Sequence, residues 1–106
     1  MGTPHSIDFW RVRTGSEEDF LADWRSFAAW AASLHGFGGS GYLLRDLDEP
    51  RQFISVRTWE SVEALRMFRH LPAAQDHLDR LRGHAERHSP LSLEDVTPDL
   101  GRVPHD

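Results

Sequence analysis

Two histidines in the second half of the chain, His70 and His77, have the chemistry needed for proton transfer. An imidazole changes its charge near neutral pH, so it can serve as a general base or as an iron ligand. His77 shares a predicted helical face with Leu78 and Leu81, so we expect it to point toward a pocket or its rim. His70 precedes a helix break at Pro72 and is expected to overhang the pocket mouth. For His77 the alternative is a histidine at the edge of the core that bonds to backbone.

One predicted strand, residues 52–59, carries three further candidates on a single face: Ser55, Arg57 and Trp59. Trp59 would line a pocket and offer its indole N–H to a ligand oxygen, or it closes the strand and packs against the next helix. Arg57 would hold an anionic substrate or intermediate, or it pairs with a carboxylate at the surface or at an interface. For Trp59 and for Arg57, both alternatives stay open.

His84 and His88 stand four residues apart, a spacing that can bind a metal when both side chains lie on one helix. We predict a helix from Ala73 to about His88, which would give them that geometry. A zinc site needs three or four protein ligands, and no third ligand is evident in the sequence. We therefore expect a solvated helix face here and no metal site.

The composition narrows the class of protein. The chain of 106 residues has a net charge of -5, no cysteine, and twelve cationic side chains that are all arginine. The lack of cysteine excludes disulfides, thiolate zinc sites and thiol catalysis. An acidic chain without a basic stripe argues against a nucleic-acid partner. No apolar run approaches the roughly 20 residues of a membrane span, and the N-terminus lacks signal-peptide features, so we expect a cytoplasmic protein.

The hydrophobic periodicity predicts a single α+β domain over residues 1–106, with its core at about 6–97 and a flexible tail at 98–106. The predicted elements are strands at 6–13, 39–47, 52–59 and 91–97 and helices at 16–33, 62–70 and 73–88. Ser16 and the acids after it favour a helix start, and Gly36 suits the left-handed residue that follows a helix. This order is β-α-β-β-α-β, the ferredoxin-like arrangement with a four-stranded antiparallel sheet.

The first predicted strand has apolar side chains on both faces, with Ile7 and Phe9 on one and Trp10 and Val12 on the other. Helices can cover only one face of the sheet in so short a chain. The other face, which holds either Phe9 or Trp10, must then be covered by a partner. We predict a homodimer in which the two sheets pack together into a barrel-like sandwich.

Several short motifs, taken in order, resemble those of the antibiotic biosynthesis monooxygenase (ABM) domains, which are small dimeric α+β barrels. The motifs are Gly15-Ser16-Glu17-Glu18-Asp19-Phe20 at a helix start, Gly36-Phe37 before the second strand, the strand Tyr42-Leu43-Leu44-Arg45, and Trp59-Glu60-Ser61 followed by Ala64. Each motif is short, and their order and spacing carry the resemblance. It extends over roughly residues 6–97, nearly the whole chain.

The resemblance implies a ligand pocket inside each monomer, between the sheet and the helices. The family's enzymes include cofactor-free oxygenases that turn aromatic polyketides into quinones, quinol monooxygenases and haem-degrading enzymes. The implied function is a cofactor-independent monooxygenase for a small aromatic, polyketide-like or quinol substrate, with His77 or His70 assisting deprotonation beside Trp59. The side chains expected to bind substrate are Trp10, Phe27, Phe37, Ser55, Arg57 and Phe68.

Departures from the family pattern leave alternatives open. Quinone-forming members place a polar amide near position 55, where this chain has Ser55, and an aromatic residue where it has Leu65. A non-catalytic small-molecule-binding or accessory protein of the same fold is therefore an alternative. Haem-degrading members pair a histidine near the His77 position with an asparagine on the first strand and a tryptophan in the helix. This chain has Asp8 (or a neighbour) and Phe68 there, so haem binding is the lesser alternative.

Overall fold

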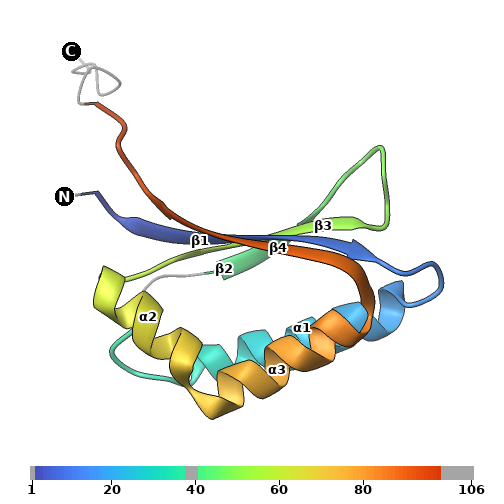
Figure 1. The fold of residues 1–106 in the computed structure, drawn as a ribbon, viewed down its shortest axis with the longest axis horizontal. Coiled ribbons are helices and arrows are strands. Elements are labelled where there is room, and N and C mark those ends of the chain that lie inside the picture. The colour runs from blue at the N-terminus through green and yellow to red at the C-terminus, as the bar shows by residue number, and fades with distance from the viewer. Residues whose placement is uncertain (1, 38–40, 99–106) are drawn as a thin grey trace.

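The computed structural model describes residues 2–37 and 41–98. Its elements are β1 (Pro4–Val12), α1 (Glu17–Ala32), β2 (Gly41–Arg45), β3 (Gln52–Thr58), α2 (Val62–His70), α3 (Pro72–Gly83) and β4 (Ala85–Glu94). The strands form one antiparallel sheet in the order β2-β3-β1-β4, and the helices lie together on one face of it (Figure 1). The predicted ferredoxin-like α+β fold is confirmed, with the second helical region divided into α2 and α3.

Local sequence determines where the helices begin and end. Ser61 caps α2, because its hydroxyl accepts a hydrogen bond from the backbone N–H of Ala64 over 3.0 Å. Pro72 cannot continue α2 but fits the first turn of α3, where a backbone N–H has no intrahelical partner. Beyond α1, Gly36 takes a φ of +87°, the left-handed conformation predicted for it.

The C-terminal part of the chain differs from the prediction. α3 ends at Gly83, and β4 already begins at Ala85, so the predicted helix to His88 is too long and the predicted strand at 91–97 starts too late. The local sequence has good helical propensity. Pairing with β1 overrides that propensity, and it places His88 directly opposite Trp10 in the sheet.

β4 also ends at Glu94, three residues before the predicted end at 97, and the remaining element boundaries agree with the prediction within two residues where the structure describes them. Two predicted features fall outside the described residues: the start of the second strand at 39–40 and the tail beyond Pro98. Within ranges 2–37 and 41–98, no helix has the length and apolar character to cross a membrane.

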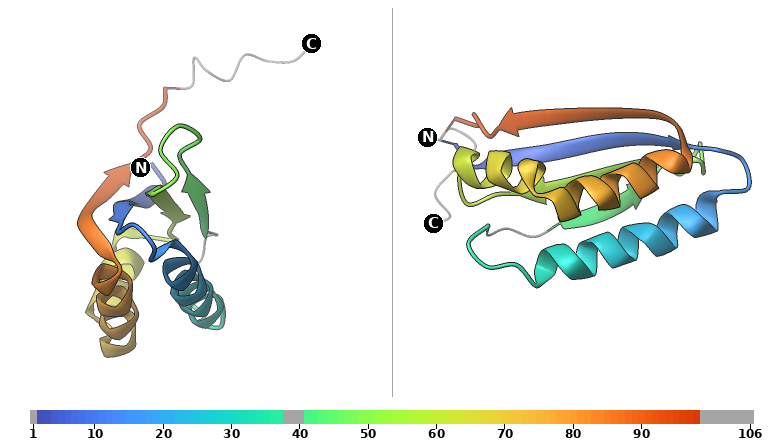
Figure 2. Two further views of the ribbon diagram at one scale, coloured as in Figure 1. Left: turned by 90° about the vertical axis from the view of Figure 1, so that its right-hand side faces the viewer. Right: turned by 60° about the horizontal axis from the view of Figure 1, so that its bottom comes forward.

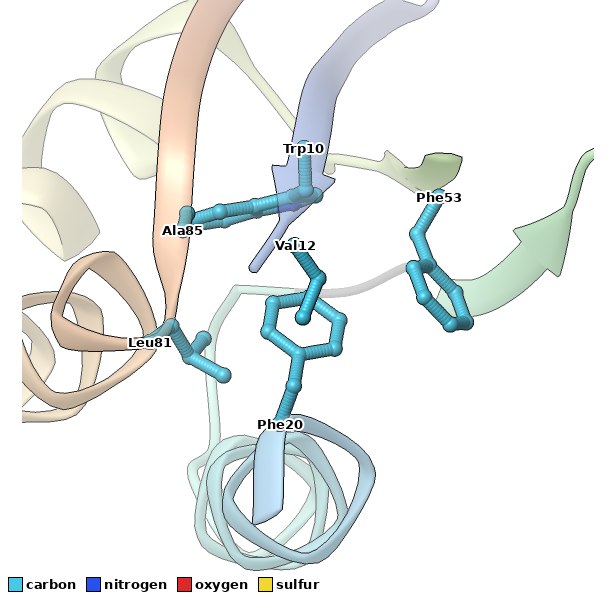
Figure 3. Packing of buried hydrophobic residues seen from close by; sticks show 6 residues of the cluster. All are labelled: Trp10, Val12, Phe20, Phe53, Leu81 and Ala85. Atoms are coloured by element: carbon cyan, nitrogen blue, oxygen red, sulfur yellow. The ribbon is translucent and has the colours of Figure 1, made fainter. Parts of the chain in front are cut away.

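The main hydrophobic core lies between the sheet and the helices. Its six buried residues come from β1, α1, β3, α3 and β4: Trp10, Val12, Phe20, Phe53, Leu81 and Ala85 (Figure 3). Phe20 extends from α1 into this core, and its ring centroid lies 5.5 Å from that of Trp10 and 5.1 Å from that of Phe53. A second buried cluster around Trp59 and Phe68 joins the residue that follows β3 to α2, the end of α1 and the start of α3.

The opposite face of the sheet has no helix over it in the described chain (Figure 2). Strand alternation and register place seven large side chains there, which we call the outer apolar face: Ile7, Phe9, Tyr42, Leu44, Ile54, Leu91 and Leu93. Phe9 is 37 % exposed, whereas its neighbour Trp10 is 1 % exposed. Of the two alternatives for β1, Phe9 is therefore the residue on the uncovered face.

Candidate active site

A cavity of about 560 Å³ lies between the sheet and the helices, where the family resemblance implies a ligand pocket. Its helix side carries an aromatic and apolar wall, which includes Trp24 and Phe27 of α1, Phe68 of α2 and Leu78 of α3, together with the polar side chains of Arg69, Gln75 and Arg82. Its sheet side is polar, and we call this group the sheet-side polar set: Ser6, Asp8, Ser55, Arg57 and His88. An aromatic wall facing a polar floor is the usual lining of a small-molecule site.

The strand register explains why the polar side chains converge. On the antiparallel pair β1 and β3, Asp8 lies opposite Ser55 and Ser6 lies opposite Arg57, so all four point to the helix side. On the other flank of β1, His88 of β4 lies opposite Trp10 and therefore on the same side. Three strands thus contribute to one polar floor.

Asp8 and His88 form a hydrogen-bonded pair within this floor. The Nε2 atom of His88 lies 2.8 Å from Oδ1 of Asp8, and the two side chains are 9 % and 19 % exposed respectively. The imidazole stacks on the indole of Trp10, with ring centroids 3.8 Å apart and planes 9° from parallel. Arg82 of α3 approaches from the other side, and its Nε–H donates to Nδ1 of His88 over 3.3 Å. Both imidazole nitrogens therefore have partners.

Each of two tryptophans donates its indole N–H to a serine of the floor. Trp59 donates to Oγ of Ser6 over 2.9 Å, and Trp10 donates to Oγ of Ser55 over 3.1 Å. Because a hydroxyl both accepts and donates, each serine can still donate its O–H toward the cavity. The indole N–H predicted to meet a substrate oxygen at Trp59 is bound to Ser6 here, so the serine hydroxyls are the donors that a ligand oxygen would meet.

Replacing Ser6 by Ala should destabilise the protein by about 1–3 kcal/mol, because the buried indole N–H of Trp59 would lose its acceptor. Ser92 is the matched control: it lies opposite Ser6 on β4 but is exposed. Ser92→Ala should change the unfolding free energy by less than about 0.5 kcal/mol. Urea unfolding of both variants measures the difference, and equal stabilities would show that the Trp59–Ser6 bond adds nothing.

Arginine dominates the charge of the cavity. The lining includes three arginines, Arg57, Arg69 and Arg82, whereas Asp8 is the one carboxylate among the lining residues that the structure describes. The guanidinium of Arg57 lies 4.6 Å from the ring centroid of Trp59 and 5.3 Å from that of Phe68. Burial lowers the pKa of Arg57 from its ordinary value, but an arginine keeps its proton in proteins. The cavity therefore suits an anionic ligand.

The two histidines singled out from the sequence are not among the described residues that line the cavity. His77 lies between α3 and α1, where its ring centroid is 5.3 Å from that of Phe27 and 5.1 Å from that of Trp30. His70 is exposed at the end of α2, and its Nδ1 lies 2.7 Å from the carbonyl oxygen of Arg66. Helical spacing placed His77 correctly on the buried side of its helix, but that side meets α1 rather than the cavity.

His77 should make the protein less stable in acid. Desolvation lowers its pKa below the ordinary value of 6.5, and the nearby Arg80 adds to this. The unfolded chain then binds the proton more tightly than the folded one, so the free energy of unfolding falls as the pH drops below about 6.5. His77→Gln should lose less stability between pH 7.5 and 5, whereas the exposed His35→Gln should follow the wild type. If His77→Gln lost as much unfolding free energy as the wild type between pH 7.5 and 5, the destabilising role of His77 would be contradicted.

The residues predicted to bind substrate fall into two groups. Phe27, Ser55, Arg57 and Phe68 line the cavity, and so does Trp59. Trp10 and Phe37 are not among the lining residues. Trp10 is buried beneath His88, and Phe37 packs edge-on against Trp59 and Phe68 with centroids 6.4 and 5.7 Å away. Both support lining side chains from behind.

His84 and His88 do not share a helix, so the predicted metal-binding spacing is not realised. His84 follows the end of α3 and its Nε2 lies 2.7 Å from Oδ2 of Asp23 on α1, whereas His88 is on β4. Among the described residues, no group of three or more His, Cys, Asp or Glu side chains could hold a metal ion. The predicted solvated helix face is wrong for His88, which is part of the cavity floor.

The sequence-based prediction missed the Asp8–His88 pair because it extended the last helix through His88. The sequence contained a usable signal: Gly83 suits a helix end, and the following residues read equally well as an alternating strand. A strand beginning at Ala85 would have brought His88 into the sheet, and the register of β4 against β1 then places it on the same face as Asp8.

Comparison with known families agrees with this geometry. The family described as antibiotic biosynthesis monooxygenase matches residues 5–80. The chain belongs to this family. The matched range includes four members of the sheet-side polar set, but it ends before His88.

Solved structures share the ABM fold at low sequence identity. A mutant form of SnoaB, described as a cofactor-independent oxygenase from Streptomyces nogalater, has 19 % identity and a TM-score of 0.82 over 92 % of this chain and 97 % of that chain. A protein from Bordetella bronchiseptica named for the same family has 21 % identity and a TM-score of 0.77, over 92 % and 100 %. A third, from Nitrosomonas europaea, has 15 % identity and a TM-score of 0.79, over 92 % and 95 %. Such identities establish the fold alone. No curated protein matches the chain by sequence.

Proposed function

We propose that the protein is a cofactor-independent monooxygenase that acts on a small aromatic substrate, of polyketide-like or quinol type, in the cavity between sheet and helices. The observation that carries the proposal is a carboxylate–imidazole pair facing an aromatic wall inside one cavity. Membership of the ABM family supports an oxygenase-type fold, and one structural relative is described as a cofactor-independent oxygenase.

The size and lining of the cavity support an aromatic ligand. Its volume of about 560 Å³ lies within the roughly 300–1,000 Å³ typical of small-molecule sites. The rings of Phe27 and Phe68, whose centroids are 5.9 Å apart, and the indole of Trp24 offer flat apolar surfaces on which a fused-ring ligand can stack.

For an anthrone, the proposed reaction begins when a base removes a proton from the ring methylene carbon. The carbanion, whose charge spreads onto the carbonyl oxygen, reduces O2 and forms a carbon–oxygen bond with it. The peroxide takes up a proton, and the hydroperoxide then loses the second hydrogen of that carbon as a proton together with hydroxide. One CH2 group and one O2 molecule become one C=O group and one water, and all electrons come from the substrate.

The charge of the cavity supports this route. The reaction passes through an anion, and fixed positive charge in a partly dry site lowers the energy of such an intermediate. Arg57, Arg69 and Arg82 provide that charge, and the hydroxyls of Ser6 and Ser55 can donate to the anionic oxygen. The base is assigned here to the Asp8–His88 pair rather than to His77 or His70, since the pair lies in the cavity.

We also propose that the outer apolar face mediates the homodimer. It places seven large side chains from four strands on one side of the sheet, five of which are at least 37 % exposed. Packing two such faces together would remove them from water and form the barrel-like sandwich predicted from the sequence. A cytoplasmic location stays a prediction.

A non-catalytic small-molecule-binding protein is the second candidate function. It is favoured by the serine at position 55, where quinone-forming relatives place an amide, and by the indole N–H groups that already bind serines. Haem binding is the lesser alternative, and His77 packs against Phe27 and Trp30 instead of lining the cavity. A Soret band on adding haemin would favour it.

Oxygen uptake by the purified, metal-free protein with a panel of anthrones and quinols tests the proposal. We expect uptake above the spontaneous rate without added flavin or metal. Trp24 and Trp59 line the cavity, so a bound ligand should quench their fluorescence. Quenching of tryptophan fluorescence by these compounds without oxygen uptake would favour the binding-protein alternative. If the protein shows no oxygen uptake and no fluorescence quenching, both the oxygenase function and the binding-protein alternative are contradicted.

A further inference from the structure

The cavity contains two side chains that could accept the substrate proton, Asp8 and His88. The inference that follows rests on the proposed function, and it concerns which of the two takes the proton. A triad-like arrangement would make the imidazole the base and the carboxylate its support. The hydrogen bonds in this structure favour the reverse assignment.

The tautomer of His88 follows from its neighbours. Arg82 has only donors, so Nδ1 of His88 must accept the bond from its Nε–H and cannot carry a proton. The ring proton therefore sits on Nε2, 2.8 Å from Oδ1 of Asp8, and is donated to that carboxylate oxygen. With one nitrogen donating and the other accepting, neither is available to a substrate.

The imidazole cannot easily turn to free a nitrogen. It is stacked on Trp10 at 3.8 Å, and that indole is itself fixed by its bond to Ser55. Rotation would break the stacking together with both hydrogen bonds. Backbone pairing of β1 with β4 holds the two rings opposite each other.

Asp8 is in the opposite situation. Its Oδ1 accepts from His88, but its Oδ2 has no hydrogen-bond partner among the described residues. The side chain lines the cavity and keeps 19 % of its surface exposed. A carboxylate with one oxygen fixed and the other accessible has the geometry of a general base.

We propose that Asp8 is the catalytic base and that His88 is a positioning residue, which holds the carboxylate through its Nε2–H while Arg82 fixes its tautomer. The proton moves from the acidic carbon or hydroxyl of the substrate to Oδ2 of Asp8. The imidazole stays neutral throughout, and the negative charge passes from Asp8 to the substrate, close to the arginines.

Anaerobic hydrogen–deuterium exchange at the methylene carbon of anthrone in D2O, followed by proton NMR, tests the assignment without the oxygen step. The wild type should exchange faster than buffer. Asp8→Asn should lower the enzyme-dependent rate by about 10²–10⁴-fold, the usual contribution of a general base. His88→Gln should stay within about tenfold of the wild type, because its amide N–H can still donate to Oδ1. His88→Leu, which offers no donor, should fall well below His88→Gln.

Several results would overturn the assignment. They are an Asp8→Asn variant that still exchanges, a His88→Gln variant as inactive as Asp8→Asn, and a wild type that exchanges no faster than buffer. Nitrogen-15 NMR of the wild type gives a check that needs no variant: it should show His88 protonated on Nε2 alone, and a proton on Nδ1 would contradict the proposal. Exchange without oxygen uptake would remove the oxygenase function and leave the base assignment standing.

Discussion

We expect a Phe9→Asp variant to be a monomer at micromolar concentrations at which the wild type is expected to sediment as a dimer of 12.2 kDa chains. Phe9 is on the outer apolar face, in one of the two central strands of the sheet. A symmetric interface contains two copies of each change, and each buried unpaired carboxylate costs several kcal/mol. The dissociation constant should therefore rise by on the order of 10³-fold or more, since each 1.4 kcal/mol is tenfold.

Met67→Asp is the control for this experiment. Met67 is 63 % exposed on α2, which lies in the helix layer on the opposite side of the sheet from the outer apolar face. Its replacement also removes a large exposed apolar side chain but should leave the dimer intact. A wild-type protein that sediments as a monomer, or a Phe9→Asp variant that remains dimeric, would contradict an interface through the sheet.

Filling the cavity from the helix side should abolish turnover while leaving the sheet-side polar set untouched. Ala28 of α1 lines the cavity and is half-buried, so Ala28→Trp would place an indole where the substrate is proposed to stack. We expect kcat/KM to fall by at least about 100-fold, equivalent to roughly 2.7 kcal/mol of lost transition-state binding. The cost in stability should be about 1–3 kcal/mol, as for other overpacked sites.

Ala29→Trp is the matched control, because Ala29 is the next residue of α1 and is exposed. It adds the same side chain to the same helix without entering the cavity, so turnover should stay near the wild-type rate. Circular dichroism establishes that both variants are folded. Full activity in a folded Ala28→Trp variant would show that the reaction takes place elsewhere.

The sequence predicted the fold well because its strongest signals are local. Ser61 and Pro72 begin helices by capping and by ring geometry, which depend on a few neighbouring residues. The apolar residues on both sides of β1 indicated a second covered face. The end of α3 was predicted less well, because residues 85–88 become a strand through pairing with a segment about 75 residues earlier in the chain.

The same long-range pairing explains why the candidate site was only partly predicted. Trp59, Ser55 and Arg57 were found because strand alternation alone puts them on one face. His77 was chosen over His88 because helical periodicity identifies a buried side without saying what covers it. The partnership of Asp8 with His88 depends on the register between β1 and β4, and no spacing rule within one element encodes it.

Turnover of an anthrone under oxygen-18 gas by the metal-free protein is the most direct test of the proposed function. The account predicts accelerated formation of the quinone, with one oxygen-18 atom at the former methylene carbon and the other in water. The Asp8→Asn variant should form the quinone no faster than buffer, whereas the Ala29→Trp variant should accelerate its formation as the wild type does. Quinone formation no faster than in buffer, or a product without the label, would contradict the account.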